Sequence, residues 1–77
     1  MMKETLQTII ENLVDDKNSI SINEVGGEHS IVFEVKVSEK DMGKIIGKQG
    51  KVAQSIRTIM KALAAKEKKR ISVEFIG

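Results

Sequence analysis

The sequence predicts an α+β domain whose elements follow the order α-β-β-α-α-β. Three observations predict it. Apolar residues recur at helical spacing in some segments, they alternate with polar residues in others, and turn or helix-start signals separate the segments. Three strands with one apolar face and three amphipathic helices make two layers. We therefore expect a three-stranded mixed sheet that is covered on one face by three helices.

The first half of the chain predicts one helix and a β-hairpin. An apolar stripe at helical spacing is formed by Leu6, Ile9, Ile10, Leu13 and Val14. The turn-forming residues 15–18 end this helix. Alternation then predicts strands over 20–25 and 31–37, and the pair Gly26-Gly27 between them supplies the positive φ of a hairpin turn.

The second half predicts two helices and a strand. Ser38, with Asp41 three residues later, is typical of a capping box at the start of a helix, which residues 47–50 then interrupt. The stripe of the next helix comprises Val52, Ile56, Ile59, Met60 and Leu63. The last strand covers 71–75 and, after a helical crossover, can pair in parallel with 31–37. The expected core comprises Leu6, Ile10, Leu13, Ile22, Phe33, Val35, Ile56, Ile59, Leu63, Val73 and Phe75.

Composition limits the function. The chain has 77 residues, enough for one domain over 1–77, with no Cys, one His and two aromatic residues, Phe33 and Phe75. This argues against thiol chemistry, a Cys- or His-rich metal site and a ladder of stacked aromatic side chains. We expect no metal, no cofactor and no enzymatic activity. No apolar run reaches the ~18 residues of a membrane span. The N-terminus lacks the apolar stretch of a signal peptide, so we expect a cytoplasmic protein without membrane attachment.

Charge is distributed unevenly along the chain. Residues 1–39 carry three lysines and eight carboxylates, a net charge of −5, whereas residues 40–70 carry ten basic and two acidic side chains, a net charge of +8. A basic half of this kind is typical of a surface that binds a polyanion, although a solvated basic helix has the same composition.

The basic half contains the segment Gly43-Lys44-Ile45-Ile46-Gly47-Lys48-Gln49-Gly50-Lys51. Its spacing differs from the Walker A loop and from the dinucleotide-binding fingerprint, and it follows a helix rather than a strand. What remains is Gly47-x-x-Gly50 between two helices. Such a loop lets a sugar–phosphate chain approach the backbone closely, and the next helix presents its positive dipole end.

The chain resembles a KH domain, and its element order is that of the type II variant. The stretch from Gly43 to Ala62 is similar to the small single-KH bacterial proteins of the KhpA (YlqC) family. The resemblance implies a stand-alone RNA-binding protein that forms homodimers and works with a larger KH-containing partner of the KhpB (Jag) type. It also implies RNA chaperone-like activity and a link to cell elongation and division.

The resemblance implies roles for particular residues. Gly47 and Gly50 allow close backbone approach, Lys48 and Gln49 face phosphates, and Arg57 reaches a phosphate or a base or is simply solvated. The complete candidate RNA-binding set is Lys44, Ile45, Ile46, Gly47, Lys48, Gln49, Gly50, Lys51 and Arg57. Ile45 and Ile46 flank the groove, and the pattern leaves open which of them packs inward. Ala53 stands where many KH motifs have a bulky aliphatic residue, which predicts a shallower groove.

The expected ligand is about four nucleotides of single-stranded RNA, and single-stranded DNA stays open because no group here identifies the 2′-hydroxyl. Met60 and Ala64-Ala65 are candidates for a subunit contact, although core packing explains Met60 equally well. The alternative function is a protein-interaction adaptor that pairs mainly with another KH protein. Enzymatic activity is the third of these hypotheses. The single histidine, His29, stands beside a glycine turn, and the sequence offers no nucleophile to pair with it.

Overall fold

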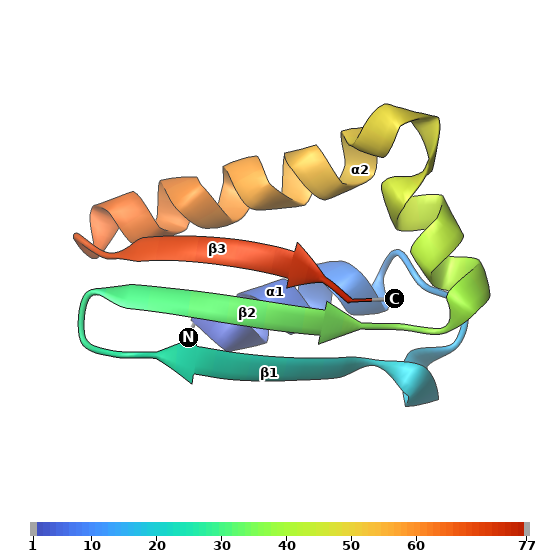
Figure 1. Ribbon diagram of the computed structural model, residues 1–77, viewed down its shortest axis with the longest axis horizontal. Coiled ribbons are helices and arrows are strands. Elements are labelled where there is room, and N and C mark those ends of the chain that lie inside the picture. Colours follow the sequence, from blue (N-terminus) through green and yellow to red (C-terminus); the bar gives the residue numbers. More distant parts are fainter. Residues whose placement is uncertain (1, 77) are drawn as a thin grey trace.

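The computed structural model describes residues 2–76 and confirms the α+β class with a mixed three-stranded sheet (Figure 1). Strands β1 (Ser21–Gly26) and β2 (Ser30–Lys36) pair antiparallel, and β3 (Arg70–Phe75) pairs with β2 in parallel. The order in the sheet is β1-β2-β3, so β1 and β3 are its edges. The register places Ile22 opposite Val35 and Phe33 opposite Val73, which gathers the apolar side chains on one face.

The hairpin between β1 and β2 needs glycine at one of its two glycine positions. Gly26 has φ of 151°, and a Cβ added there would lie 2.2 Å from the carbonyl oxygen of Ser30. A Cβ on Gly27 would meet no atom within 4 Å. The predicted positive φ is therefore found at Gly26, where the partner strand passes too close for any side chain.

Helix α1 (Met2–Glu11) is shorter than predicted. The chain turns after Glu11, and the 3-10 turn η1 (Lys17–Ser19) follows before β1. Leu13 was expected in the core but is 39% exposed, whereas Val14 is buried. The expectation for Leu13 is wrong because the helical spacing that would have turned it inward ends before it is reached.

Helix α2 (Glu39–Lys66) contains both of the predicted helices, joined at a bend. Residues 47–50 have non-helical backbone angles, so α2 consists of a first arm (39–46) and a second arm (51–66), which meet at a sharp angle (Figure 1). Ser38 is the N-cap, and its hydroxyl oxygen accepts a hydrogen bond from the N–H of Asp41 at 3.2 Å. The predicted helix start and interruption are thereby confirmed.

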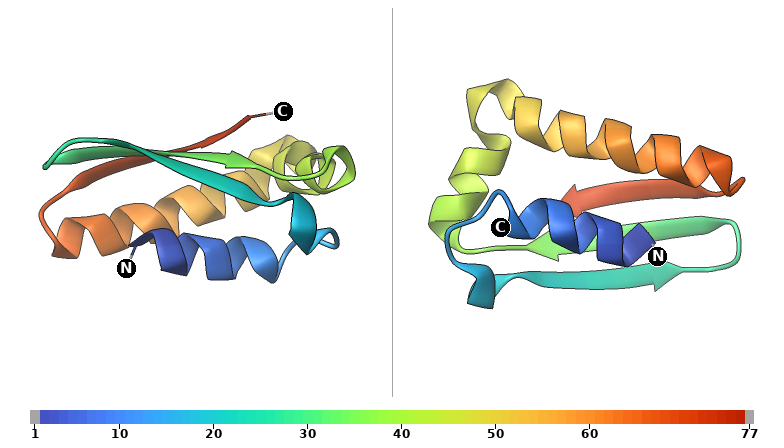
Figure 2. Two further views of the ribbon diagram at one scale, coloured as in Figure 1. Left: turned by 90° about the horizontal axis from the view of Figure 1, so that it is seen from below. Right: turned by 180° about the vertical axis from the view of Figure 1, so that it is seen from behind.

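Both helices lie on the same side of the sheet, and the opposite sheet face is open (Figure 2). The core between the layers comprises Met2, Leu6, Ile10, Val14, Ile31, Phe33, Val35, Ile45, Ala53, Ile56, Met60, Ala64, Ile71 and Val73. Ile22, Leu63 and Phe75 pack against it from partly buried positions. No helix in the described part of the chain has the length and apolar character needed to cross a membrane.

The second arm packs the predicted stripe against the sheet, with the exception of Ile59. Ile59 was expected in the core but is 46% exposed, whereas its neighbour Met60 is fully buried. The buried positions are Ala53, Ile56, Met60 and Ala64, at spacings of three and four residues. Because one residue turns a helix by about 100°, choosing Met60 for the core directs Ile59 outward. Met60 and Ala64 are thus core residues, which confirms the core explanation for Met60 and removes both from a subunit contact, whereas Ala65 is exposed.

Candidate nucleic-acid interface

The bend of α2 is built from three consecutive residues in the left-handed region. Lys48, Gln49 and Gly50 have φ of 52°, 64° and 71°, while Gly47 is extended with φ of −70° and ψ of 175°. Left-handed backbone is costly for residues that carry a Cβ. This conformation at Lys48 and Gln49 marks a constrained segment of the kind found at binding sites.

Glycine is favoured at the two glycine positions of the loop for different physical reasons. Gly50 lies in the left-handed region, which glycine adopts without steric cost. Gly47 does not, because its φ and ψ are open to any residue. A Cβ added to Gly47 would meet no atom of the protein within 4 Å. Neither backbone conformation nor internal packing therefore requires glycine at 47, whereas the close approach of a ligand would.

The loop is electrically positive. The second arm begins at Lys51, and the positive end of its dipole points toward the loop. Lys48, Gln49 and Lys51 are exposed, and within residues 2–76 the two lysine side chains form no ion pair. These two ammonium groups remain available to an anion at the loop.

Lys44 is paired with carboxylates of the fold. Its Nζ lies 2.9 Å from Oδ2 of Asp15 and 3.0 Å from Oδ1 of Asp41. These hydrogen bonds, to Asp15 first and then to Asp41, raise the pKa of the Lys44 ammonium. Lys44 was expected to add charge for phosphates, but the structure commits its side chain to two carboxylates.

Asp41 has a structural role beyond the helix start that the sequence predicted for it. It is 1% exposed, and its carboxylate accepts the backbone N–H groups of Asp15 and Asp16, each at 3.0 Å. These two bonds are the main reason that the pKa of Asp41 lies far below its ordinary value. The hydroxyl of Ser38 also donates to it, at 2.8 Å. The carboxylate that was predicted to cap its own helix thus also ties the α1–β1 connection to the first arm.

The structure separates the two isoleucines before the loop. Ile45 is 1% exposed and belongs to the core, whereas Ile46 is 53% exposed. Ile46 lines an apolar hollow of about 520 Å³ together with Val37, Glu39, Met42 and Gly43. Of the two candidate groove residues, only Ile46 has its side chain exposed. Ala53 is buried in the core as well.

Arg57 lies in the seam between the second arm and the edge strand β3. Its Nε donates to the backbone carbonyl of Val73 at 3.1 Å, and its guanidinium carbon lies 5.5 Å from the centre of the Phe75 ring. The side chain therefore covers part of the open edge of the sheet. Its Nη1 also donates to the side-chain oxygen of Gln54 at 3.4 Å, which leaves Nη2 without a hydrogen-bond partner among residues 2–76.

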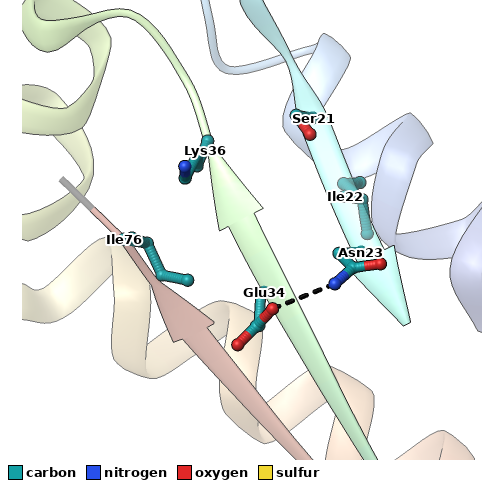
Figure 3. Close-up of a pocket in the computed structure, with 6 residues that line it drawn as sticks. All are labelled: Ser21, Ile22, Asn23, Glu34, Lys36 and Ile76. Atoms are coloured by element: carbon teal, nitrogen blue, oxygen red, sulfur yellow. Dashed lines mark hydrogen bonds between the residues drawn. The ribbon is translucent and has the colours of Figure 1, made fainter. Parts of the chain in front are cut away.

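A second hollow lies on the open sheet face and has the wrong chemistry for a polyanion. Its volume is about 340 Å³, and it is lined by Ser21, Ile22, Asn23, Glu34, Lys36 and Ile76 (Figure 3). There Asn23 donates its side-chain amide to the Glu34 carboxylate at 3.1 Å. None of the lining residues belongs to the loop or to α2. Within residues 2–76 there is also no cluster of three or more side chains that would suit a metal ion.

The fold and the loop together define a KH domain. A family model of the KhpA/KhpB KH domain matches residues 3–75. The proteins named RNA-binding protein KhpA from Clostridium acetobutylicum and Chlamydia pneumoniae are 53% and 44% identical to this chain over 75 residues. These matches cover 97% of this chain and 100% and 96% of the two relatives. The protein of the same name from Borreliella burgdorferi is 40% identical over 95% of this chain and 89% of its own. The chain belongs to the KhpA/KhpB KH-domain family.

Proposed function

We propose that this chain binds single-stranded RNA without catalysing a reaction, and that residues 47–50 hold the sugar–phosphate backbone of about four nucleotides. The observation that carries the proposal is Gly47, whose Cα faces open space although its backbone would accept any residue. The same function is supported by the left-handed turn beside it, by Lys48 and Lys51, which form no ion pair within residues 2–76, and by the names of the relatives.

In this proposal each group has a separate task. The N–H groups at the start of the second arm and the ammonium of Lys48 bind phosphate oxygens. Ile46 offers an apolar wall to a base, and the free part of Arg57 contacts a base or a phosphate across the seam. The absence of Gly47's side chain brings the backbone of the loop within reach of the ligand.

The test is an NMR titration of the isotope-labelled protein with a four-nucleotide RNA, repeated from about 50 to about 200 mM salt. The double variant Lys48→Asp/Gln49→Asp keeps the loop conformation accessible, because Asp tolerates the left-handed region. It should remain folded by circular dichroism and lose at least about ten-fold in affinity, since phosphate contacts dominate the affinity. A control of equal charge change is Lys3→Asp/Gln7→Asp on the exposed side of α1, near whose start acidic residues are tolerated.

Equal weakening by both double variants would mean that net charge, rather than the loop, controls binding. Unchanged binding by the loop variant would remove the loop from the interface. The same titration with single-stranded DNA of matching sequence decides whether the 2′-hydroxyl contributes.

We further propose that two copies of the chain pair through the outward side of the second arm. Ile59 is a large apolar side chain that is 46% exposed, and it lines a hollow of about 510 Å³ with Lys51, Gln54, Ser55 and Thr58. Pairing would give two loops in one particle and raise affinity for longer RNA by avidity. In the alternative function, an adaptor that pairs with a KhpB-type KH protein, the partner would bind to this same surface.

Light scattering after size-exclusion chromatography tests the pairing. Ile59→Lys should shift a dimer to a monomer and leave binding of a four-nucleotide RNA in place, whereas Asn18→Lys, at an exposed position on η1 that does not line this hollow, is the control for added charge. A wild-type mass of one chain at all accessible concentrations would reject the homodimer. The proposal also includes RNA chaperone-like activity, and a role in cell elongation and division in the cytoplasm. Strand-annealing assays with the loop variant test the chaperone-like activity.

A further inference from the structure

A second basic site lies at the far end of α2 from the loop. Lys61, Lys69 and Arg70 line a hollow of about 310 Å³ together with Ala64 and Ile71. No carboxylate lines it in the described part of the chain, and none of its three basic side chains is in an ion pair within residues 2–76. Three cations around one hollow that no carboxylate lines favour an anion there. Lys69 also lines a neighbouring hollow with Glu24 and Glu67, so Lys61 and Arg70 are the cations that this argument uses.

The backbone holds this site in place. The second arm ends in a tight turn in which Lys68 is left-handed with φ of 56°, Lys69 N–H donates to Ala64 O at 2.9 Å and Lys68 N–H to Ala65 O at 3.1 Å. Arg70 N–H then donates to His29 O at 2.7 Å, which ties the turn to the hairpin. The basic residues are therefore part of a hydrogen-bonded corner rather than of a free tail.

The seam between α2 and β3 connects the two ends. Arg57 contacts Val73 midway along the seam, and Lys61, one helical turn later, shares the hollow with Ile71. The second arm and β3 thus run in opposite directions along the seam, as Figure 1 shows. From Lys51 to Lys61 the helix rises by about 15 Å, a distance that a few nucleotides of extended strand cover.

We propose that the basic hollow is a second phosphate subsite, and that a single RNA strand held at the loop continues along the α2–β3 seam past Arg57 to Lys61 and Arg70. This inference rests on the proposed function, because it needs a strand that is already held at residues 47–50. The alternative explanation of the cluster is that its positive charge only offsets the negative end of the helix dipole.

The experiment extends the RNA by phosphates alone. A four-nucleotide RNA is compared with the same RNA carrying a tail of abasic ribose-phosphate units at its 5′ or its 3′ end, so that the tail adds no base and no second binding register. The proteins are the wild type, Lys61→Gln/Arg70→Gln, and a control with the same loss of charge, Lys17→Gln/Lys36→Gln, at exposed positions on η1 and β2.

For the wild type, one of the two tails should tighten binding by about ten-fold, which corresponds to about 1.4 kcal/mol. Lys61→Gln/Arg70→Gln should lose that gain and lower the salt slope of the tailed RNA by about 1.4, or about 0.7 for each lost phosphate contact. For the untailed RNA, the affinity of Lys61→Gln/Arg70→Gln should equal that of the control variant within experimental scatter.

Three outcomes would overturn the inference while the proposed function stands: neither tail tightens binding, the variant keeps the full gain, or the control loses as much of it. A loss of thermal stability in Lys61→Gln/Arg70→Gln together with an intact gain would assign the cluster to the helix dipole. If the wild type does not bind the untailed RNA through its loop, it is the proposed function itself that fails.

Discussion

The ammonium group of Lys44 lies 3.0 Å from a carboxylate oxygen of Asp41, one turn earlier on α2. That carboxylate also holds two backbone N–H groups of the α1–β1 connection. The pair therefore joins two parts of the molecule: the α1–β1 connection and the first arm of α2, which leads into the loop. The positive charge of Lys44, which lies in the basic half of the sequence, therefore stabilises the fold.

Asp41→Asn should destabilise the protein and lower the midpoint of thermal unfolding by several degrees. An amide has one acceptor oxygen, so it cannot accept both N–H groups of residues 15 and 16 and also pair with Lys44. Calorimetry measures the midpoint. Asp15→Asn, whose side chain is exposed and whose own N–H donor is unchanged, is the control and should cost much less.

The dependence of stability on pH should report the same carboxylate. The pKa of Asp41 is lowered in the folded protein from an ordinary value of 3.8. Its contribution is therefore fully present above that value and is lost as the pH falls toward the lower folded pKa. The difference in free energy of unfolding between wild type and Asp41→Asn should be constant near neutral pH and shrink below about pH 4. Urea denaturation across that range measures it, and a difference that grows on acidification would contradict the assignment.

The two loop glycines should respond differently to alanine. Gly47→Ala should leave stability unchanged or raise it by about 0.4–1 kcal/mol, because alanine restricts the unfolded chain and fits the native φ and ψ. Gly50→Ala should cost about 1 kcal/mol, because it places a Cβ in the left-handed region. RNA affinity should nevertheless fall in Gly47→Ala. A stable Gly47→Ala protein with wild-type affinity would show that no ligand approaches this Cα.

The neighbouring isoleucines should separate stability from binding. Ile45→Val should cost about 0.5–1.5 kcal/mol, because it removes a buried methylene from the core. Ile46→Val should change stability by less than about 0.5 kcal/mol, as expected for an exposed side chain. In RNA titrations the order should reverse, with Ile46→Val binding RNA more weakly than wild type and Ile45→Val binding it about as well as wild type. Urea unfolding and NMR titration of the same samples provide both measurements.

Lys68→Gly should stabilise the protein by about 0.5–1 kcal/mol. Lys68 occupies the left-handed position after the end of α2, with φ of 56°, where glycine avoids the steric cost that lysine incurs. The ordinary conformational freedom of glycine offsets part of the gain. Chemical denaturation should show a higher midpoint with the same slope, and a lower midpoint would mean that the Lys68 side chain stabilises the turn.

Much of this molecule was predictable because its signals are local. Alternation located all three strands to within one or two residues at most, and Ser38 marked the start of α2. Residues 47–50 interrupted the helix where the glycines stand. These features depend on backbone preferences and on neighbours a few residues away, which a single sequence contains in full.

By itself, then, the sequence determined the fold class, the hairpin, the glycine loop and the basic half in which the loop lies. Only the tertiary structure decided that Lys44 is paired, that Ile45 is buried and Ile46 exposed, and that Ile59 faces outward. The physical reason is distance along the chain. The hydrogen bond from the N–H of Asp15 to Asp41 joins residues 26 positions apart. The rotation of the second arm against the sheet and the early end of α1 set which side chains turn inward, and no local period encodes either one.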